Sequence, residues 1–127
     1  DRQYSYAALC FEMGNVKSKV NTDEVDKEVK SHPVVMYTKA GCGYCAMAKE
    51  LLNKESIEFK ECYLDEIRAQ RPDEYQAFAN GLVYTTKMTT VPQIFICGQV
   101  IGGYTELTKL NEAKQLLAKI EECAQSY

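Results

Sequence analysis

Cys42 and Cys45 are the residues whose type and spacing most clearly allow chemistry. They follow an apolar run, Val34–Tyr37, that predicts a buried strand, and after a short loop they begin a helical pattern. The first turn of a helix has unsatisfied N–H groups and a partial positive charge, which favour the thiolate form of Cys42. Lys39, three residues upstream, acts in the same direction. Cys45 lies one helical turn further on and can close a disulfide, so the pattern predicts a redox-active dithiol.

A Cys-x-x-Cys motif has two other common explanations, half of a zinc site and a pair of buried thiols. A structural zinc site needs about four ligands, which usually come from a second such motif. The chain has no second Cys-x-x-Cys or Cys/His pair, and its only histidine, His32, precedes a proline in an expected surface loop. A redox pair on a strand–helix–strand unit is therefore the favoured interpretation.

The elements that must position this pair can be predicted on both sides of it. We expect a strand over residues 34–38, a helix over about 43–54 and a second strand over 57–64. Strand, helix and strand of these lengths predict a right-handed crossover with parallel strands. The side chains that the helix should bury are Met47, Ala48, Leu51 and Leu52.

Two further helices should flank this unit. Asn21 as N-cap, with Glu24 three residues later, predicts a helix start with a capping box. Pro72 suits the first turn of another helix and Asn80–Gly81 its end, which leaves residues 82–89 as a long connection.

The last part of the chain should add a hairpin and a helix. Residues 93–97 and 100–102 read as strands joined by a two-residue turn at Gly98–Gln99. One long final helix should begin near Thr105, and its expected apolar face is Leu107, Leu110, Ala113, Leu117, Ile120 and Ala124. The element order predicts an α/β fold, with a four-stranded mixed sheet covered by helices on both faces, as in thioredoxin.

Composition narrows the function classes. The 127 residues carry a net charge of −3 and are 46% hydrophobic, which predicts one soluble globular domain. We find no basic stripe, so nucleic acid is excluded as an expected partner, and no apolar run long enough to span a bilayer.

The six cysteines do not resemble a dense disulfide framework. We therefore expect a reducing, cytoplasmic environment with one working pair, and a mitochondrial location stays open. Cys62 and Cys97 are interpreted as small apolar strand residues, and Cys123 as lying in the frayed end of the last helix.

Residues 1–19 are expected to be a flexible leader or tail, and 20–127 the folded domain. The segment 13–18, Met-Gly-Asn-Val-Lys-Ser, matches the N-myristoylation pattern if Met13 is the first residue of the native protein. Acylation of Gly14 would then tether the chain to a membrane reversibly.

Three motifs together carry a resemblance to a known family. Lys39-x-x-Cys42-x-Tyr44-Cys45, Thr90–Phe95 and Gly102–Leu107 are similar in order and spacing to the motifs of glutaredoxins. The resemblance extends over about residues 22–124. It implies the same thioredoxin-like fold that the local patterns predict.

The resemblance implies a glutathione-dependent thiol–disulfide oxidoreductase. Cys42 would attack the glutathione sulfur of a glutathionylated protein or open a protein disulfide, and Cys45 or a second glutathione would resolve the intermediate. Glutathione would be the reductant, the partners would be glutathionylated or disulfide-bonded proteins, and the chain would be mainly a monomer.

The resemblance also implies where glutathione binds. Lys39 would pair with a carboxylate, helped by Gln76, since Thr89 stands where some members carry a basic residue. Val91 would pair through its backbone with the cysteinyl part of glutathione, held by a cis peptide to Pro92. The start of the last helix would hold the γ-glutamyl group. The full expected set is Lys39, Tyr44, Gln76, Thr90, Val91, Pro92, Gly103, Thr105 and Glu106.

An alternative stays open beside the reductase, because some relatives share a [2Fe–2S] centre between two subunits. Cys42 would then be the protein ligand and glutathione would supply the other thiolates. Gly43, in place of the usual proline, is compatible with a flexible motif loop. Cys45 argues against the monothiol carriers, which have serine at this position.

Overall fold

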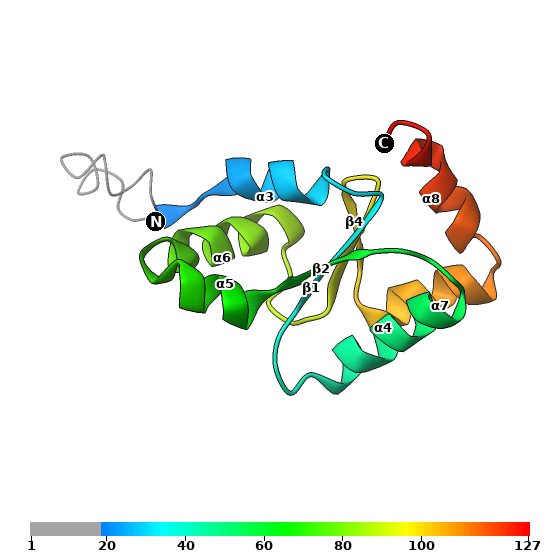
Figure 1. The fold of residues 1–127 in the computed structure, drawn as a ribbon, viewed down its shortest axis with the longest axis horizontal. Helices are drawn as coiled ribbons and strands as arrows, with labels where there is room; N and C mark the ends of the chain where they lie inside the picture. Colours follow the sequence, from blue (N-terminus) through cyan, green and yellow to red (C-terminus); the bar gives the residue numbers. More distant parts are fainter. Residues whose placement is uncertain (1–18) are drawn as a thin grey trace.

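The computed structural model describes residues 19–127, and Cys10 and Gly14 lie outside this range (Figure 1). None of the helices in this range combines the length and the hydrophobicity that a bilayer-spanning helix needs. The elements in chain order are α3 (Thr22–Val29), β1 (Val34–Thr38), α4 (Gly43–Lys54), β2 (Lys60–Tyr63), α5 (Leu64–Gln70), α6 (Pro72–Thr86), β3 (Gln93–Ile96), β4 (Gln99–Gly102), α7 (Tyr104–Glu112) and α8 (Leu116–Ala124).

The sheet has the strand order β2-β1-β3-β4. β1 runs parallel to β2, with Val35 opposite Lys60, and antiparallel to β3, with Val35 opposite Phe95. β3 and β4 form an antiparallel hairpin. The expected four-stranded mixed sheet and parallel crossover are confirmed.

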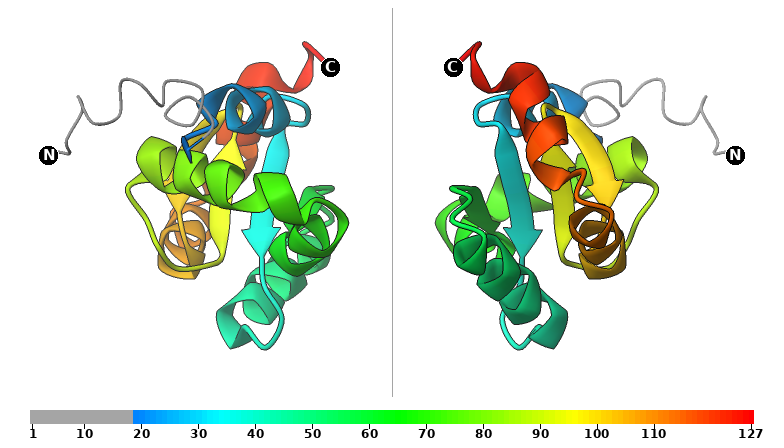
Figure 2. Two further views of the ribbon diagram at one scale, coloured as in Figure 1. Left: turned by 90° about the vertical axis from the view of Figure 1, so that its left-hand side faces the viewer. Right: turned by 90° about the vertical axis from the view of Figure 1, so that its right-hand side faces the viewer.

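Both faces of β1 are buried, which explains its unbroken apolar sequence. On one face, Val35 and Tyr37 pack with side chains of α3 and α6. On the other, Val34 and Met36 pack with side chains of α4, α7 and α8. Figure 2 shows the two helical layers on either side of the strands. This central strand carries the loop that leads into the cysteine pair.

The predicted start of the first helix is confirmed. The Asn21 side chain accepts the backbone N–H of Glu24 at 3.1 Å and donates to the Glu24 carboxylate at 3.1 Å. The Glu24 carboxylate also pairs with Arg71 at the start of α6. The capping box therefore fastens α3 to a second helix.

The expected end of α6 at Asn80–Gly81 is wrong, because the helix continues to Thr86 and ends at Lys87 in the left-handed region. A Cβ atom on Gly81 would lie 2.1 Å from the backbone oxygen of Asn21. Gly81 therefore allows the start of α3 to approach α6 closely and does not end the helix. The expected connection over residues 82–89 is accordingly much shorter.

The second strand is shorter than the predicted 57–64, because Leu64 opens α5, a helix that the sequence analysis missed. Asp65 and Glu66 lie in its first turn, where acidic side chains favour the helix dipole. In α4, Met47 is 44% exposed, contrary to expectation, whereas Cys45, Ala48 and Leu52 form the buried face. The helix is rotated so that the inner cysteine faces the core.

The prediction of a single long C-terminal helix is also wrong. The chain breaks at Ala113–Gln115, with Lys114 at φ +59°, and forms α7 and α8. The break changes which side chains face inward, so Leu116 is buried and Leu117 is 58% exposed.

The hairpin turn lies one residue earlier than predicted. Cys97 and Gly98, with φ of +53° and +81°, form the turn, and Gln99 begins β4. Cys97 is joined by a disulfide to Cys123 near the end of α8, with Cα atoms 5.6 Å apart. The sequence analysis did not foresee this second disulfide. Among the described residues, Cys62 alone stays outside a disulfide and is buried, as predicted.

Candidate active site

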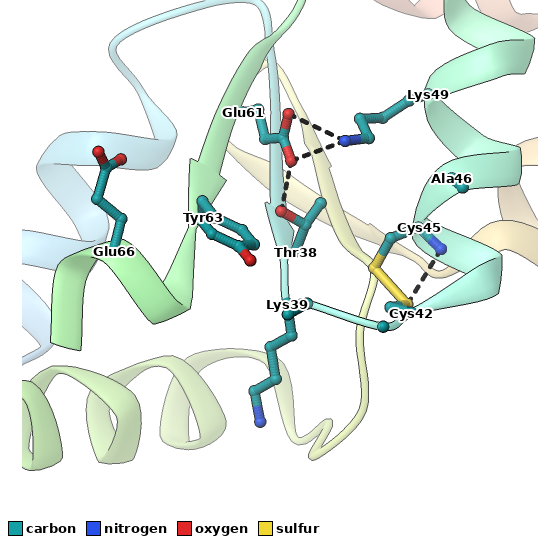
Figure 3. A pocket seen from close by; sticks show the side chains of 11 residues that line it. Thr38, Lys39, Cys42, Cys45, Ala46, Lys49, Glu61, Tyr63 and Glu66 are labelled. Carbon is teal, nitrogen blue, oxygen red and sulfur yellow. Dashed lines mark hydrogen bonds and ion pairs between the residues drawn. A yellow bond between two sulfur atoms is a disulfide. The ribbon is translucent and has the colours of Figure 1, made fainter. Parts of the chain in front are cut away.

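The cysteine pair lies at the first turn of α4 (Figure 3). Cys42 is the N-cap, and its sulfur accepts the backbone N–H of Cys45 at 3.1 Å. The two residues are joined by a disulfide with Cα atoms 5.2 Å apart. Cys42 is half-buried and Cys45 is 2% exposed. An incoming thiol or disulfide can therefore reach the outer sulfur, while the inner sulfur is shielded.

The loop before Cys42 is held by a contact that the sequence did not reveal. The backbone N–H of Ala40 donates to the Asp65 carboxylate on α5 at 3.0 Å. Gly41 adopts φ +71°, which favours glycine. Lys39 is exposed and extends away from Glu61 in Figure 3. The unpredicted helix α5 thus positions the loop that carries Lys39.

A polar cluster lies beside the pair, on the side of β2. The Thr38 hydroxyl donates to Glu61 at 2.6 Å, and Lys49 donates to the two Glu61 oxygens at 3.1 and 3.3 Å. Partial burial would raise the pKa of Glu61, but these hydrogen bonds outweigh it and hold that pKa below its usual value. With Cys42 and Cys45, the cluster lines a hollow of about 550 Å³. Lys49 is four residues after Cys45 on the same helix, and this spacing was the only sequence signal.

On the other side of Cys42 lies a groove of about 400 Å³. Its lining residues are Tyr44, Met88, Thr90, Val91, Pro92, Gly103, Tyr104, Thr105 and Glu106. The Val91–Pro92 peptide is cis, as expected. The Val91 carbonyl oxygen lies 3.5 Å from the Cys42 sulfur. The structure therefore brings three separate segments of the chain to one groove beside Cys42.

The start of α7 forms one wall of the groove. The Gly103 N–H donates to the Glu106 carboxylate at 2.7 Å, and Gly102 has φ +122° with no room for a Cβ beside Glu106. Glu106 thus caps its own helix, which satisfies one N–H group at this end. The binding of the γ-glutamyl group at this helix start stays a prediction.

Tyr44 and Tyr104 form an aromatic pair at the groove. Their ring centroids are 5.9 Å apart and their planes are inclined by 29°. Tyr44 is 63% exposed. The sequence analysis missed Tyr104 and Met88, because only the tertiary structure brings α7 and the loop after α6 to this groove.

Two predicted residues lie outside the groove lining. Lys39 lines the hollow on the opposite side of the pair. Gln76 is exposed on α6, where it donates to Asn80 at 2.9 Å. Their roles in carboxylate binding stay predictions.

Comparison with known proteins shows which family the chain resembles. Residues 34–101 match the glutaredoxin family model. Glutaredoxin-2 of Schizosaccharomyces pombe is 36% identical over 98 residues, which cover 77% of this chain and 84% of that protein. Human mitochondrial glutaredoxin-2 is 31% identical over 102 residues, which cover 80% of this chain but only 58% of that protein. The chain therefore spans little more than half of the human relative.

Solved structures of glutaredoxins share the fold of this chain. The buckwheat glutaredoxin–glutathione complex superposes with a TM-score of 0.70 at 27% identity, over 80% of this chain and 88% of that one. The matched family model, the identity to relatives and the shared fold agree with the motifs at Cys42–Cys45, Val91–Pro92 and Gly102–Gly103. The chain belongs to the glutaredoxin family.

Proposed function

We propose that the chain reduces glutathione mixed disulfides and protein disulfides with glutathione as electron donor. The observation that carries this proposal is the placement of the reachable Cys42 sulfur between a helix N-terminus and a groove lined by most of the predicted glutathione-binding residues. A bound glutathione is named for the buckwheat relative, and the fold shared with it supports the same ligand here.

In the first step, the Cys42 thiolate attacks the glutathione sulfur of a mixed disulfide. That S–S bond breaks, the substrate thiolate leaves, and Cys42 carries glutathione. The thiolate is favoured by the N–H of Cys45 and by the dipole of α4, and the same groups make Cys42 a good leaving group later.

The intermediate can be resolved in two ways. A second glutathione thiolate can attack the bound glutathione sulfur, which releases glutathione disulfide and restores Cys42. Alternatively, Cys45 can attack the Cys42 sulfur, which releases glutathione and forms the Cys42–Cys45 disulfide seen in the structure. Because Cys45 is buried, the second way takes place only within the molecule.

The groove would hold the glutathione part of the substrate. The backbone of Val91 faces the groove beside the reacting sulfur, and the N-terminal end of α7 offers N–H groups to a carboxylate. Such contacts bind glutathione whatever protein it is attached to. The proposal is therefore a specificity for the glutathionyl group, with little discrimination among protein substrates.

The test is steady-state turnover of a glutathionylated peptide, with glutathione, glutathione reductase and NADPH. We expect turnover that requires glutathione and is not supported by thioredoxin reductase alone. Turnover driven equally well by thioredoxin reductase, or no turnover with glutathione, would contradict the proposal.

The alternative, a shared [2Fe–2S] centre, stays a prediction. The half-buried Cys42 sulfur suits an iron ligand, and a glutathione in the groove would supply a second thiolate. Cys45 competes by forming the disulfide. Anaerobic incubation with iron, sulfide and glutathione, followed by visible spectroscopy and gel filtration, distinguishes a coloured dimer from a colourless monomer.

A further inference from the structure

We propose that Cys97 and Cys123 form a second thiol–disulfide couple, whose oxidation by glutathione disulfide fastens α8 to the β3–β4 turn and stabilises the fold. This site is distinct from the Cys42–Cys45 pair, and the inference does not rest on the proposed reductase activity. Four observations on the pair carry it: its location, the backbone at Cys97, the packing of α8 and the surroundings of the sulfurs.

The two pairs lie at opposite ends of the sheet. Val91, at 3.5 Å from the Cys42 sulfur, precedes β3, and Cys97 follows it. The path from one to the other is six steps along a mostly extended chain, which is about 20 Å at about 3.3 Å per residue. In Figure 2, α8 and the loop before α4 lie at opposite ends of the molecule. The second pair therefore cannot exchange with the first within one molecule.

The backbone at Cys97 has a conformation that is unusual for cysteine. Cys97 has φ +53° in a turn where asparagine, aspartate or glycine is usual. A cysteine gains no local hydrogen bond that would favour this conformation. Its Cα atom lies 5.6 Å from that of Cys123, a separation that a disulfide spans without backbone movement. The turn thus presents the Cys97 sulfur to the last turn of α8.

The packing of α8 is incomplete without a covalent bond. Leu116 is the buried residue of the helix, and Leu117 is 58% exposed. A hollow of about 350 Å³ lies between α8 and the segment before β2, with Ile57, Phe59 and Ile120 among its lining residues. Leu116 anchors the start of α8, and the disulfide anchors its end. Beyond the helix, the Tyr127 hydroxyl adds a hydrogen bond to the Lys30 carbonyl at 2.9 Å.

The surroundings of the two sulfurs favour slow exchange. The Cys97 sulfur lies 3.4 Å from the carbonyl oxygen of Lys119 and 3.6 Å from that of Ile120. The Cys123 sulfur lies 3.7 Å from the same Ile120 oxygen. These oxygens lie in the middle of α8, and Cys123 itself lies in the last turn, where the helix dipole disfavours a negative charge. Both cysteines are nevertheless partly exposed, so glutathione can reach them.

The reaction is an ordinary two-step exchange. The Cys123 thiol loses its proton to solvent, and the thiolate attacks one sulfur of glutathione disulfide, which forms a mixed disulfide and releases one glutathione thiolate. The Cys97 thiol then loses its proton, attacks the Cys123 sulfur and releases the second glutathione thiolate. Two protein thiols are oxidised, one glutathione disulfide is reduced to two glutathiones, and the two glutathione thiolates take up the two protons that the protein thiols gave to the solvent.

The test uses the full chain with the Cys42→Ser and Cys45→Ser substitutions, so that the first pair cannot respond. The protein is equilibrated with reduced glutathione or with glutathione disulfide, alkylated, mapped by peptide mass spectrometry, and melted in parallel. We expect the oxidised sample to contain a Cys97–Cys123 cross-linked peptide. It should melt about 5–15 °C higher than the reduced sample, since the bond closes a loop with a sequence separation of 26.

Two further variants in that background keep the test decisive. Adding Cys97→Asn and Cys123→Ser should abolish the difference between the buffers, because asparagine tolerates the turn conformation and cannot form the bond. Adding Cys62→Ala is the matched control, which should melt lower in both buffers and keep the difference. Equal melting temperatures in the two buffers for the starting protein, or cross-links from Cys97 and Cys123 to other cysteines, would overturn the proposal.

Discussion

One cysteine pair lies at the N-terminal end of helix α4, and the other includes a cysteine at the C-terminal end of helix α8. Cys42 caps the start of α4, and its sulfur accepts a backbone N–H. Cys123 lies in the last turn of α8, and its sulfur and that of Cys97 are next to carbonyl oxygens. The same functional group therefore faces a partial positive charge in one place and a partial negative charge in the other.

This difference in local charge suits the first pair to thiol–disulfide exchange and the second pair to a lasting structural bond. A thiolate favoured by N–H groups attacks disulfides and also leaves readily, as turnover requires. A thiol surrounded by carbonyl oxygens exchanges slowly, so a bond formed there persists. The first pair also lies beside a groove, in which we propose that glutathione binds, whereas the second joins a turn to the last helix.

The largest expected effect is loss of the nucleophile. Cys42→Ser should lower turnover of a glutathionylated peptide at least about a thousandfold, because serine at neutral pH is a very poor nucleophile. Cys45→Ser, the matched variant, should stay within about tenfold of the unmodified chain, since glutathione can resolve the intermediate. The comparison of the two pairs would break if Cys123→Ser caused a loss as large as that of Cys42→Ser.

The rates at which the individual cysteines are alkylated should distinguish the two pairs further. In the reduced protein at pH 7.5, iodoacetamide should modify Cys42 first, Cys97 and Cys123 later, and Cys62 last. Burial, with the Glu28 carboxylate beside it, raises the pKa of Cys62 to about 12, so its thiol stays protonated until strongly alkaline pH. Its thiolate fraction should be on the order of a thousandfold below that of a free cysteine. Time-resolved peptide mass spectrometry measures the order in which the cysteines are alkylated. Rapid modification of Cys62 in the native protein would contradict the burial of its thiol.

The polar cluster makes the surroundings of the first pair sensitive to acid. The pKa of Glu61 is lowered in the folded state, so its ionic contacts contribute stability above the unfolded pKa, and this contribution is lost as pH falls through the folded pKa. Glu61→Gln should lower the free energy of unfolding by about 1 kcal/mol at pH 7. The difference should shrink below about pH 4.

Urea denaturation at several pH values measures this effect. Glu58→Gln is the control, because Glu58 is exposed on the segment before β2 and should show no such pH dependence. A pH-independent difference for Glu61→Gln would mean that side-chain packing, and not charge, accounts for its contribution.

The smallest expected effects concern the loop before Cys42. A Cβ on Gly41 meets nothing within 4 Å, but φ +71° disfavours alanine, so Gly41→Ala should cost about 1 kcal/mol of unfolding free energy. Gly43 is in the first turn of α4 with equally open space, so Gly43→Ala should gain up to about 1 kcal/mol. Denaturant titration of both variants should give opposite signs, and a loss in both would contradict the assigned conformations.

Elements whose signals are local were predicted well. The unbroken apolar run of β1, the capping box of Asn21 and Glu24, and the three-residue spacing of Cys42 and Cys45 each involve neighbours in sequence. The helix start at Cys42 is of this kind, so the Cys-x-x-Cys pair could be recognised before the fold was known.

The errors occurred where distant contacts override local preference. The dipeptide Asn80–Gly81 is typical of a helix end. Nevertheless α6 continues to Thr86, because the start of α3 packs against Gly81. Leu64 extends an apparent strand, but the chain turns there into α5, whose Asp65 holds the loop before Cys42. Local propensities are worth only a fraction of a kcal/mol per residue, so packing decides such cases.

The sequence by itself determined the fold class, the central strand and the Cys42–Cys45 pair, because all three depend on periodicity or on spacing within one helical turn. Only the tertiary structure decided the partner of Cys97, the groove wall at Tyr104 and the cluster around Glu61. Cys97 and Cys123 are 26 residues apart, and their pairing depends on the break between α7 and α8 and on how α8 returns to the hairpin. Contacts of that range arise from the packing of whole elements, which no local pattern encodes.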